Sequence, residues 1–239
     1  MRALVAQTRV ELTLTLRRGE SVLLTLGIPV LLLVFFSLVD VLPIDGEAVD
    51  FLTPGVIALA VLSTAMVNVA IATGFERQYL VLKRLGTTPL GRPRLLAAKT
   101  IAVLAVEVLQ VVVLSAVGLA LGWDPSVDPL VLVGAVLLGT VAFSGLGLLM
   151  AGSLRAEVTL ALANGLYLVL LLLGGIVVPL DELPGWLRDV AEWLPAAALA
   201  DAVTGALASG ASVPGRAWLV LLLWAVAAPA AAALTFRWE

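Results

Sequence analysis

The sequence contains no cysteine and no histidine, and only 13% of its 239 residues are charged. The absence of cysteine excludes disulfide frameworks and thiol nucleophiles, and the absence of both residue types excludes the usual zinc sites and imidazole general bases. A soluble domain is roughly 45–50% apolar, whereas 62% of this chain is hydrophobic. The composition therefore excludes a cytosolic enzyme, a disordered tail and a nucleic-acid-binding protein, and it predicts a membrane protein.

Long stretches with little or no charge dominate the chain, and the charged residues lie between them. Each stretch is long enough to cross a hydrocarbon core of roughly 30 Å as a helix. Six spanning helices are predicted, at residues 21–39, 51–75, 100–123, 129–154, 158–180 and 217–236. The first has the length of a full span and no small-residue cleavage site after it, which favours a retained helix over a signal peptide. The predicted fold is an all-α integral membrane protein with a single transmembrane domain over residues 1–239.

Basic residues are distributed unevenly between the two sides that these spans would create. Twelve of the 14 lysines and arginines lie in the N-terminal segment, the 75–99 loop, the turn at Arg155 and the tail at Arg237, all on one side. The other side holds only Arg188 and Arg216. Because basic loops are retained in the cytoplasm, we expect a multi-pass protein with both termini cytoplasmic.

Three segments outside the spans are informative. Residues 1–20 have the periodicity of an amphipathic helix lying in the membrane interface; the alternative is a basic leader that only sets topology. The 75–99 loop predicts a helix from Phe75 to Leu85, a turn, and a second short helix, rather than an ordinary basic loop. The external segment 181–216 carries Trp186 and Trp193 and predicts short helices that dip into the outer leaflet before the last span.

The 75–99 loop also contains a glycine spacing that resembles a phosphate-binding loop, from Gly86 to Gly91. The lysine and the hydroxyl residue that should follow are replaced by Arg92 and Pro93, and no strand precedes the motif. The sequence therefore predicts no nucleotide-hydrolysing site in this chain.

The same loop resembles the segment after the second span in ABC-2-type permeases, the membrane subunits of one class of ABC exporters. The matching residues are Glu76-Arg77, Leu82-Lys83-Arg84-Leu85, Thr88-Pro89-Leu90, Leu95-Leu96 and Lys99. The external Leu183-Pro184-Gly185-Trp186-Leu187 and Leu194-Pro195 resemble the family's segment before its last span. The order of amphipathic helix, six spans and long first cytoplasmic loop agrees over essentially the whole chain. Gln78-Tyr79 departs from the pattern, because many members have glycine and threonine there.

The resemblance implies a half-transporter, in which two permease subunits, identical or paralogous, form the pathway and bind two separate ABC ATPase subunits. The chain itself would bind membrane lipids and no cofactor, because ATP and Mg are used by the ATPase. It implies export of an amphiphilic drug, antibiotic or lipid-like solute across the bacterial plasma membrane. Such exporters need a cytoplasmic element that contacts the ATPase, and we expect these residues to form it: Arg77, Leu82, Lys83, Arg84, Leu85, Pro89, Leu90 and Arg92.

Glu107 is the one ionisable residue deep in a predicted span, and Gln110 follows on the same helical face. A charge at the bilayer centre costs roughly 2.5–3.5 kcal/mol on insertion scales, so Glu107 is a candidate functional residue. Either it faces the pathway and selects cationic substrates, or it is neutral and hydrogen-bonded between packed helices. Asn68 and Asn164 are candidate neutral partners and complete the predicted pathway.

Small residues recur in the fourth predicted span and favour close helix packing: Gly134, Ala135, Gly139, Ser144, Gly145 and Gly147.

Two other function classes compete with an ATP-driven permease. An ion-coupled secondary carrier would use Glu107 to carry the proton, but one intramembrane carboxyl is sparse for that coupling and no sequence repeat is evident. An intramembrane enzyme is disfavoured because no histidine, cysteine or paired intramembrane carboxylates are present to carry out chemistry.

Overall fold

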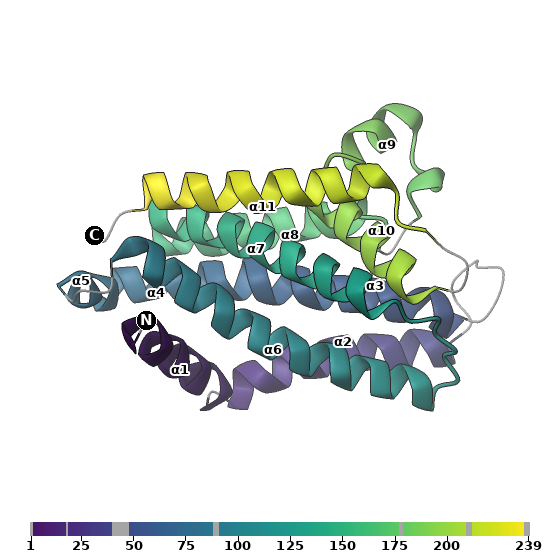
Figure 1. The fold of residues 1–239 in the computed structure, drawn as a ribbon, viewed down its shortest axis with the longest axis horizontal. Coiled ribbons are helices and arrows are strands. Elements are labelled where there is room, and N and C mark those ends of the chain that lie inside the picture. Colours follow the sequence, from purple (N-terminus) through teal and green to yellow (C-terminus); the bar gives the residue numbers. More distant parts are fainter. Residues whose placement is uncertain are drawn as a thin grey trace.

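The computed structural model of the chain describes residues 2–17, 19–39, 48–87, 91–176, 179–208 and 212–236, and the regular structure in these ranges is helical. The elements are α1 (Arg2–Arg17), α2 (Gly19–Leu38), α3 (Ala48–Leu62), η1 (Ser63–Asn68), α4 (Val69–Gln78), α5 (Val81–Gly86), α6 (Arg92–Ala120), α7 (Pro129–Ser153), α8 (Ala156–Leu173), η2 (Leu180–Glu182), α9 (Gly185–Ala191), α10 (Pro195–Leu207) and α11 (Gly215–Thr235). The long helices run side by side (Figure 1). The start of α1, the end of α11 and α5 lie at one end of the bundle, which we call the terminal end, and α9 lies at the other.

Within the described residues, five helical segments are long and apolar enough to cross a membrane: α3–η1–α4, α6, α7, α8 and α11. They correspond to five of the predicted spans. The remaining predicted span, 21–39, coincides with α2, in which the apolar stretch Thr25–Leu38 is shorter. The boundaries differ from the predicted ones in places. The second span, predicted at 51–75, extends over Ala48–Gln78. The helix of the third span, α6, begins at Arg92 instead of residue 100. The helix α8 ends at Leu173 instead of residue 180, because Gly174 follows and Gly175 adopts a left-handed φ of 67°.

The centre of the bundle is the span formed by α3, η1 and α4, which contacts α2, α7, α8 and α10. Its middle part, η1, is a π-helix, an irregularity that is frequent at functional sites. Gly147 of α7 lies against this π-helix so closely that a Cβ added there would be 2.6 Å from the Met66 carbonyl oxygen. The missing side chain therefore permits the contact between α7 and η1.

The helix α7 also packs closely on α11 and α10. A Cβ at Gly145 would lie 2.6 Å from Cδ of Pro229 in α11, and one at Gly139 would lie 2.8 Å from Cδ1 of Leu199 in α10. Proline within α11 is tolerated here because the glycine opposite it leaves room for its ring. The close packing predicted from the small residues of the fourth span is confirmed at these contacts.

The segment predicted to be external, residues 181–216, contains two α-helices with different surroundings. The short helix α9 projects from the bundle (Figure 1) and exposes Trp186. The next helix, α10, is bent from it by 81° and is almost entirely buried against α3, α7 and α11. Its alanine-rich surface permits this packing, and the backbone N–H of Asp128 donates to the Ala206 carbonyl at 2.8 Å. Together α9 and α10 have the length and composition of one further bent span.

We expect Gly147→Ala to reduce the free energy of unfolding by about 1–3 kcal/mol, because the new methyl group would overlap the η1 backbone. Thermal unfolding of the purified protein in detergent measures this effect. The control is Gly165→Ala in α8, where a Cβ meets no atom within 4 Å and alanine should stabilise the helix by up to about 1 kcal/mol. Equal melting temperatures for the two variants would contradict the packing account.

Candidate functional site

A buried cluster of charges joins three helices at the terminal end. Lys99 of α6 is 4% exposed. Its Nζ lies 2.6 Å from Oε2 of Glu76 in α4 and 3.1 Å from Oε2 of Glu11 in α1. A buried ammonium requires such partners, since an unpaired charge costs several kcal/mol away from water. The cluster therefore attaches α1 to the ends of two spans.

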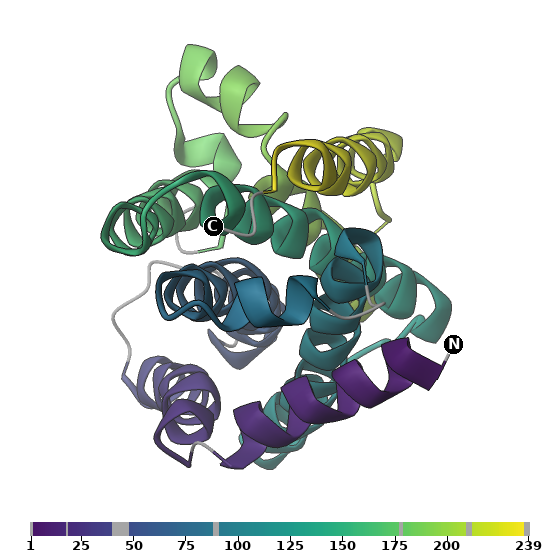
Figure 2. The same cartoon turned by 90° about the vertical axis from the view of Figure 1, so that its left-hand side faces the viewer.

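The orientation of α1 follows from this ion pair. The predicted N-terminal helix is present, and its half-buried stripe includes Gln7, Glu11 and Thr15, which face the bundle. Arg9 and Arg17 are exposed on the opposite side. In Figure 2, α1 lies across the terminal end of the bundle. A helix held this way presents its basic face outward, where phosphate headgroups are favourable partners.

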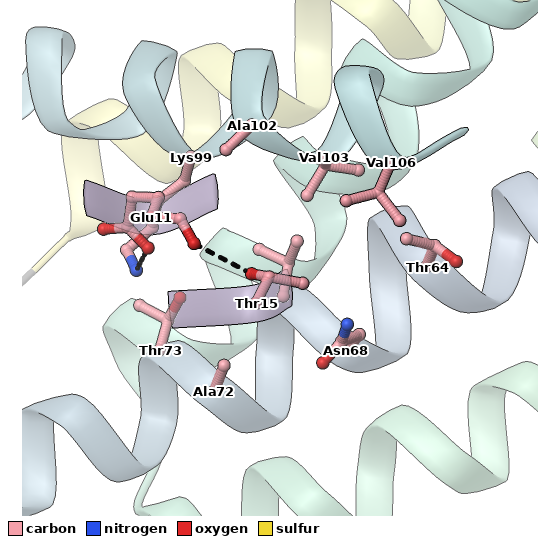
Figure 3. Close-up of a pocket in the computed structure, with 11 residues that line it drawn as sticks. Glu11, Thr15, Thr64, Asn68, Ala72, Thr73, Lys99, Ala102, Val103 and Val106 are labelled. Carbon is pink, nitrogen blue, oxygen red and sulfur yellow. Dashed lines mark hydrogen bonds and ion pairs between the residues drawn. The ribbon is translucent and has the colours of Figure 1, made fainter. Parts of the chain in front are cut away.

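A small cavity of about 50 Å³ lies beside the cluster, between α1, the η1–α4 segment and α6. Figure 3 shows Thr15, Asn68 and Thr73 around it, with Lys99 and Glu11 along one side. The Thr73 hydroxyl is buried and has no hydrogen-bond partner among the described residues. The cavity is polar and has room for water, which would satisfy that hydroxyl.

The end of α4 is tied to the connection between α7 and α8. The Arg77 guanidinium donates to the carbonyls of Ala151 at 2.9 Å and Leu154 at 2.8 Å, at the C-terminus of α7. A cation is favourable at that end of a helix because carbonyls there lack intrahelical partners. Gln78 donates to Oε1 of Glu157 in α8 at 2.7 Å. Arg77, predicted as a coupling residue, thus binds within its own chain.

The predicted helix from Phe75 to Leu85 is interrupted. It ends at Gln78, and Leu80 adopts a left-handed φ of 60° before α5 begins at Val81. The interruption turns Leu82 inward, where it is fully buried beside Leu95 and Phe236. In α5, Leu85 is half-buried against the same cluster, whereas Lys83 and Arg84 are exposed.

The predicted coupling residues are therefore divided between the protein interior and its surface. Pro89 and Leu90 lie outside the described residues, and so does the side chain of Arg92 at the start of α6. Sequence reasoning missed the most exposed apolar group of this segment, which consists of Tyr79, Leu80 and Val81, with exposed fractions of 70%, 52% and 42%. The departure from the family pattern at Gln78-Tyr79 was the sequence feature that could have indicated this exposed group.

The intramembrane residues form a polar belt across four elements. Glu107 is fully buried, and it accepts a hydrogen bond from the Thr140 hydroxyl of α7. One turn further along α6, the Gln110 amide oxygen accepts from the Thr64 hydroxyl of η1 at 3.1 Å, and its nitrogen donates to the Thr25 carbonyl of α2 at 2.9 Å. These contacts are those of helix packing.

A groove of about 380 Å³ opens between α2, the α3–η1–α4 span and α8. Its polar lining consists of hydroxyl and amide groups, from Thr25, Ser63, Thr64, Asn68, Asn164 and Tyr167, and none of the lining residues carries a formal charge. The remaining lining is aliphatic, with Ile28 and Pro29 on the α2 side and Leu59 on α3. Of the predicted pathway residues, Asn68 and Asn164 meet in this groove. Glu107 and Gln110 lie behind its wall.

The comparisons with known proteins agree with this architecture. The family model described as ABC-2 type transporter matches residues 2–208, from α1 through α10. A search of curated proteins found no match. The matched region contains α1, the segment around α5 and the five elements that line the groove, which are α2, α3, η1, α4 and α8. The chain is a multi-pass membrane protein and a permease component of an ABC transporter, and it belongs to the ABC-2 type transporter family.

Proposed function

We propose that this permease carries an amphiphilic solute, such as a drug, an antibiotic or a lipid, out of the cytoplasm through the groove between α2, η1 and α8. The observation that carries the proposal is the groove's lining, in which neutral hydroxyl and amide groups alternate with aliphatic side chains at membrane depth. Such a surface can hydrogen-bond the polar part of a solute while contacting its apolar part. Two permease subunits, identical or paralogous, would enclose the pathway.

The energy would come from ATP and Mg bound by two separate ABC ATPase subunits, because the family implies that partnership and this chain has no nucleotide-binding motif. The terminal end carries α1, the end of α4, α5, the start of α6 and the α7–α8 connection, which together hold ten of the 14 lysines and arginines. That distribution supports a cytoplasmic location for this end in a bacterial plasma membrane. The exposed residues of α5 and the turn before it would contact the ATPase there.

The ion-coupled alternative depends on Glu107 as a proton carrier. Glu107 is fully buried against Thr140 and does not line the groove. The geometry therefore favours the packing role and the ATP-driven permease.

Orientation can be tested in whole cells, since the chain has no cysteine of its own. We expect Ser126→Cys, in the exposed loop before α7, to react with an impermeant thiol reagent added outside, and Ser153→Cys, at the terminal end of α7, to remain unlabelled. The reverse labelling pattern would invert the proposed orientation and the export direction with it.

Leu80 offers a direct test of coupling, because neither its conformation nor its burial explains a leucine at this position. A left-handed conformation costs a non-glycine residue roughly 1–2 kcal/mol, and half of the side chain is exposed. We expect Leu80→Gly to leave the melting temperature unchanged or higher, yet to reduce permease-stimulated ATP hydrolysis several-fold in the complex with its ABC ATPase.

The matched control for this test is Leu82→Ala in α5. It removes a fully buried side chain and should lower the free energy of unfolding by about 2–5 kcal/mol. Wild-type stimulation and transport by Leu80→Gly would show that the exposed turn does not contact the ATPase.

The Glu107→Gln variant should transport a cationic and a neutral fluorescent amphiphile each at the same rate as the unsubstituted protein does. The glutamine oxygen can still accept from Thr140, and no charge in the groove is altered. Uptake into inverted vesicles measures both rates. A loss confined to the cationic probe would contradict this expectation and return Glu107 to the pathway.

Asn68→Leu and Asn164→Leu, which remove amides from the groove itself, should slow both probes. Unimpaired transport by both variants would refute the proposed pathway.

A further inference from the structure

The helix α2 contains a proline in the part that forms one wall of the groove. Pro29 has no backbone N–H, so the carbonyl of Thr25, four residues earlier, lacks its usual donor within the helix. Inside a membrane no water replaces that donor, and the carbonyl must be satisfied by another part of the protein. The donor is Nε2 of Gln110, which lies 2.9 Å from the Thr25 oxygen and belongs to α6.

The same amide also reaches the π-helix. Oε1 of Gln110 accepts a hydrogen bond from the Thr64 hydroxyl at 3.1 Å. Thr25 and Thr64 line the groove, whereas Gln110 is 1% exposed and does not. One side chain behind the wall thus joins α2 to η1, two elements that a solute in the groove would contact.

The other contacts of α2 are apolar, chiefly with α3. Among its described side chains, only Pro29 and Leu33 are fully buried, while Ile28, Leu31 and Phe35 are about half or more exposed. The bond between Gln110 and Thr25 adds a directional contact to this packing and fixes α2 relative to α6.

We propose that Gln110 is a positioning residue for transport: by satisfying the carbonyl that Pro29 leaves free, it holds α2 at a fixed distance from η1 and α8 and so sets the width of the groove. The inference rests on the proposed role of the groove as the solute pathway. It assigns to Gln110 an indirect function, since Gln110 contacts the wall and never the solute. The size of solute accepted follows from the position of α2.

The width of the groove can be measured with cysteine pairs because the chain has no native cysteine. Ile28→Cys and Tyr167→Cys place thiols on opposite walls, on α2 and α8. Bifunctional maleimides of increasing spacer length then report the separation in the permease–ATPase complex, and links within one chain are distinguished from links between chains by mass. In this background Gln110→Met should shift the preferred spacer to longer reagents and reduce short-spacer cross-linking several-fold.

Two controls separate positioning from a merely stabilising hydrogen bond. Thr64→Val removes the bond to η1 but leaves the bond to Thr25, so the preferred spacer should stay as in the parent. Pro29→Ala restores an N–H that can donate to the Thr25 carbonyl within α2. In the Pro29→Ala, Gln110→Met double variant the Thr25 carbonyl is satisfied within α2, so the yield of folded protein should return to the parent value. Short-spacer cross-linking should stay low, because no bond then ties α2 to α6.

An unchanged spacer preference in Gln110→Met would overturn the inference. If Gln110→Met alone fails to fold, a parent-like spacer preference in the double variant would overturn it equally. Transport of a small and a large neutral fluorescent amphiphile tests the groove itself. Gln110→Met should raise the rate of the large probe relative to the small one. A changed spacer with an unchanged transport ratio would leave Gln110 as the residue that positions α2 and would refute the groove as the pathway.

Discussion

Every backbone polar group within the hydrocarbon must find its partner inside the protein, and this constraint shapes the irregular parts of the bundle. Pro29 frees a carbonyl in α2, and Gln110 of a distant helix satisfies it. The π-helix η1 interrupts the central span, and its backbone lies against Gly147, where a side chain would not fit. Pro229 lies within α11 opposite Gly145, which leaves room for its ring. The departures from ideal helix thus occur where a neighbouring helix accommodates them.

The charged residues obey a related constraint at the terminal end. Lys99 is buried and is stable there because Glu11 and Glu76 surround it, so α1, the central span and α6 share one ion cluster. Arg77 ties the same central span to the end of α7. A displacement of α5, which follows the central span after a single turn, would therefore reach several spans together. This arrangement suits a segment that receives force from a partner protein.

The polar residues of the membrane interior separate into two groups with different roles. Asn68 and Asn164 line the groove, whose polar groups are uncharged, whereas Glu107 and Gln110 bond to neighbouring helices. A groove of this character suits amphiphilic solutes with neutral hydrogen-bonding groups better than ones recognised by charge. The belt behind it supports the wall that the solute would contact.

The sequence by itself determined the fold class, the placement of most spans, the presence of an N-terminal helix and the family, because hydrophobic length and charge distribution depend only on composition along the chain. It could not place α10 inside the bundle, since burial of an alanine-rich helix depends on the helices that cover it. It placed Arg77 and Leu82 on the coupling surface, but tertiary contacts turn both inward and leave Tyr79, Leu80 and Val81 exposed. It grouped Glu107 with Asn68 and Asn164 because all are polar residues in spans. Only the tertiary packing decided that Asn68 and Asn164 face the groove, whereas Gln110 bonds to α2 and η1 behind it and Glu107 bonds to α7.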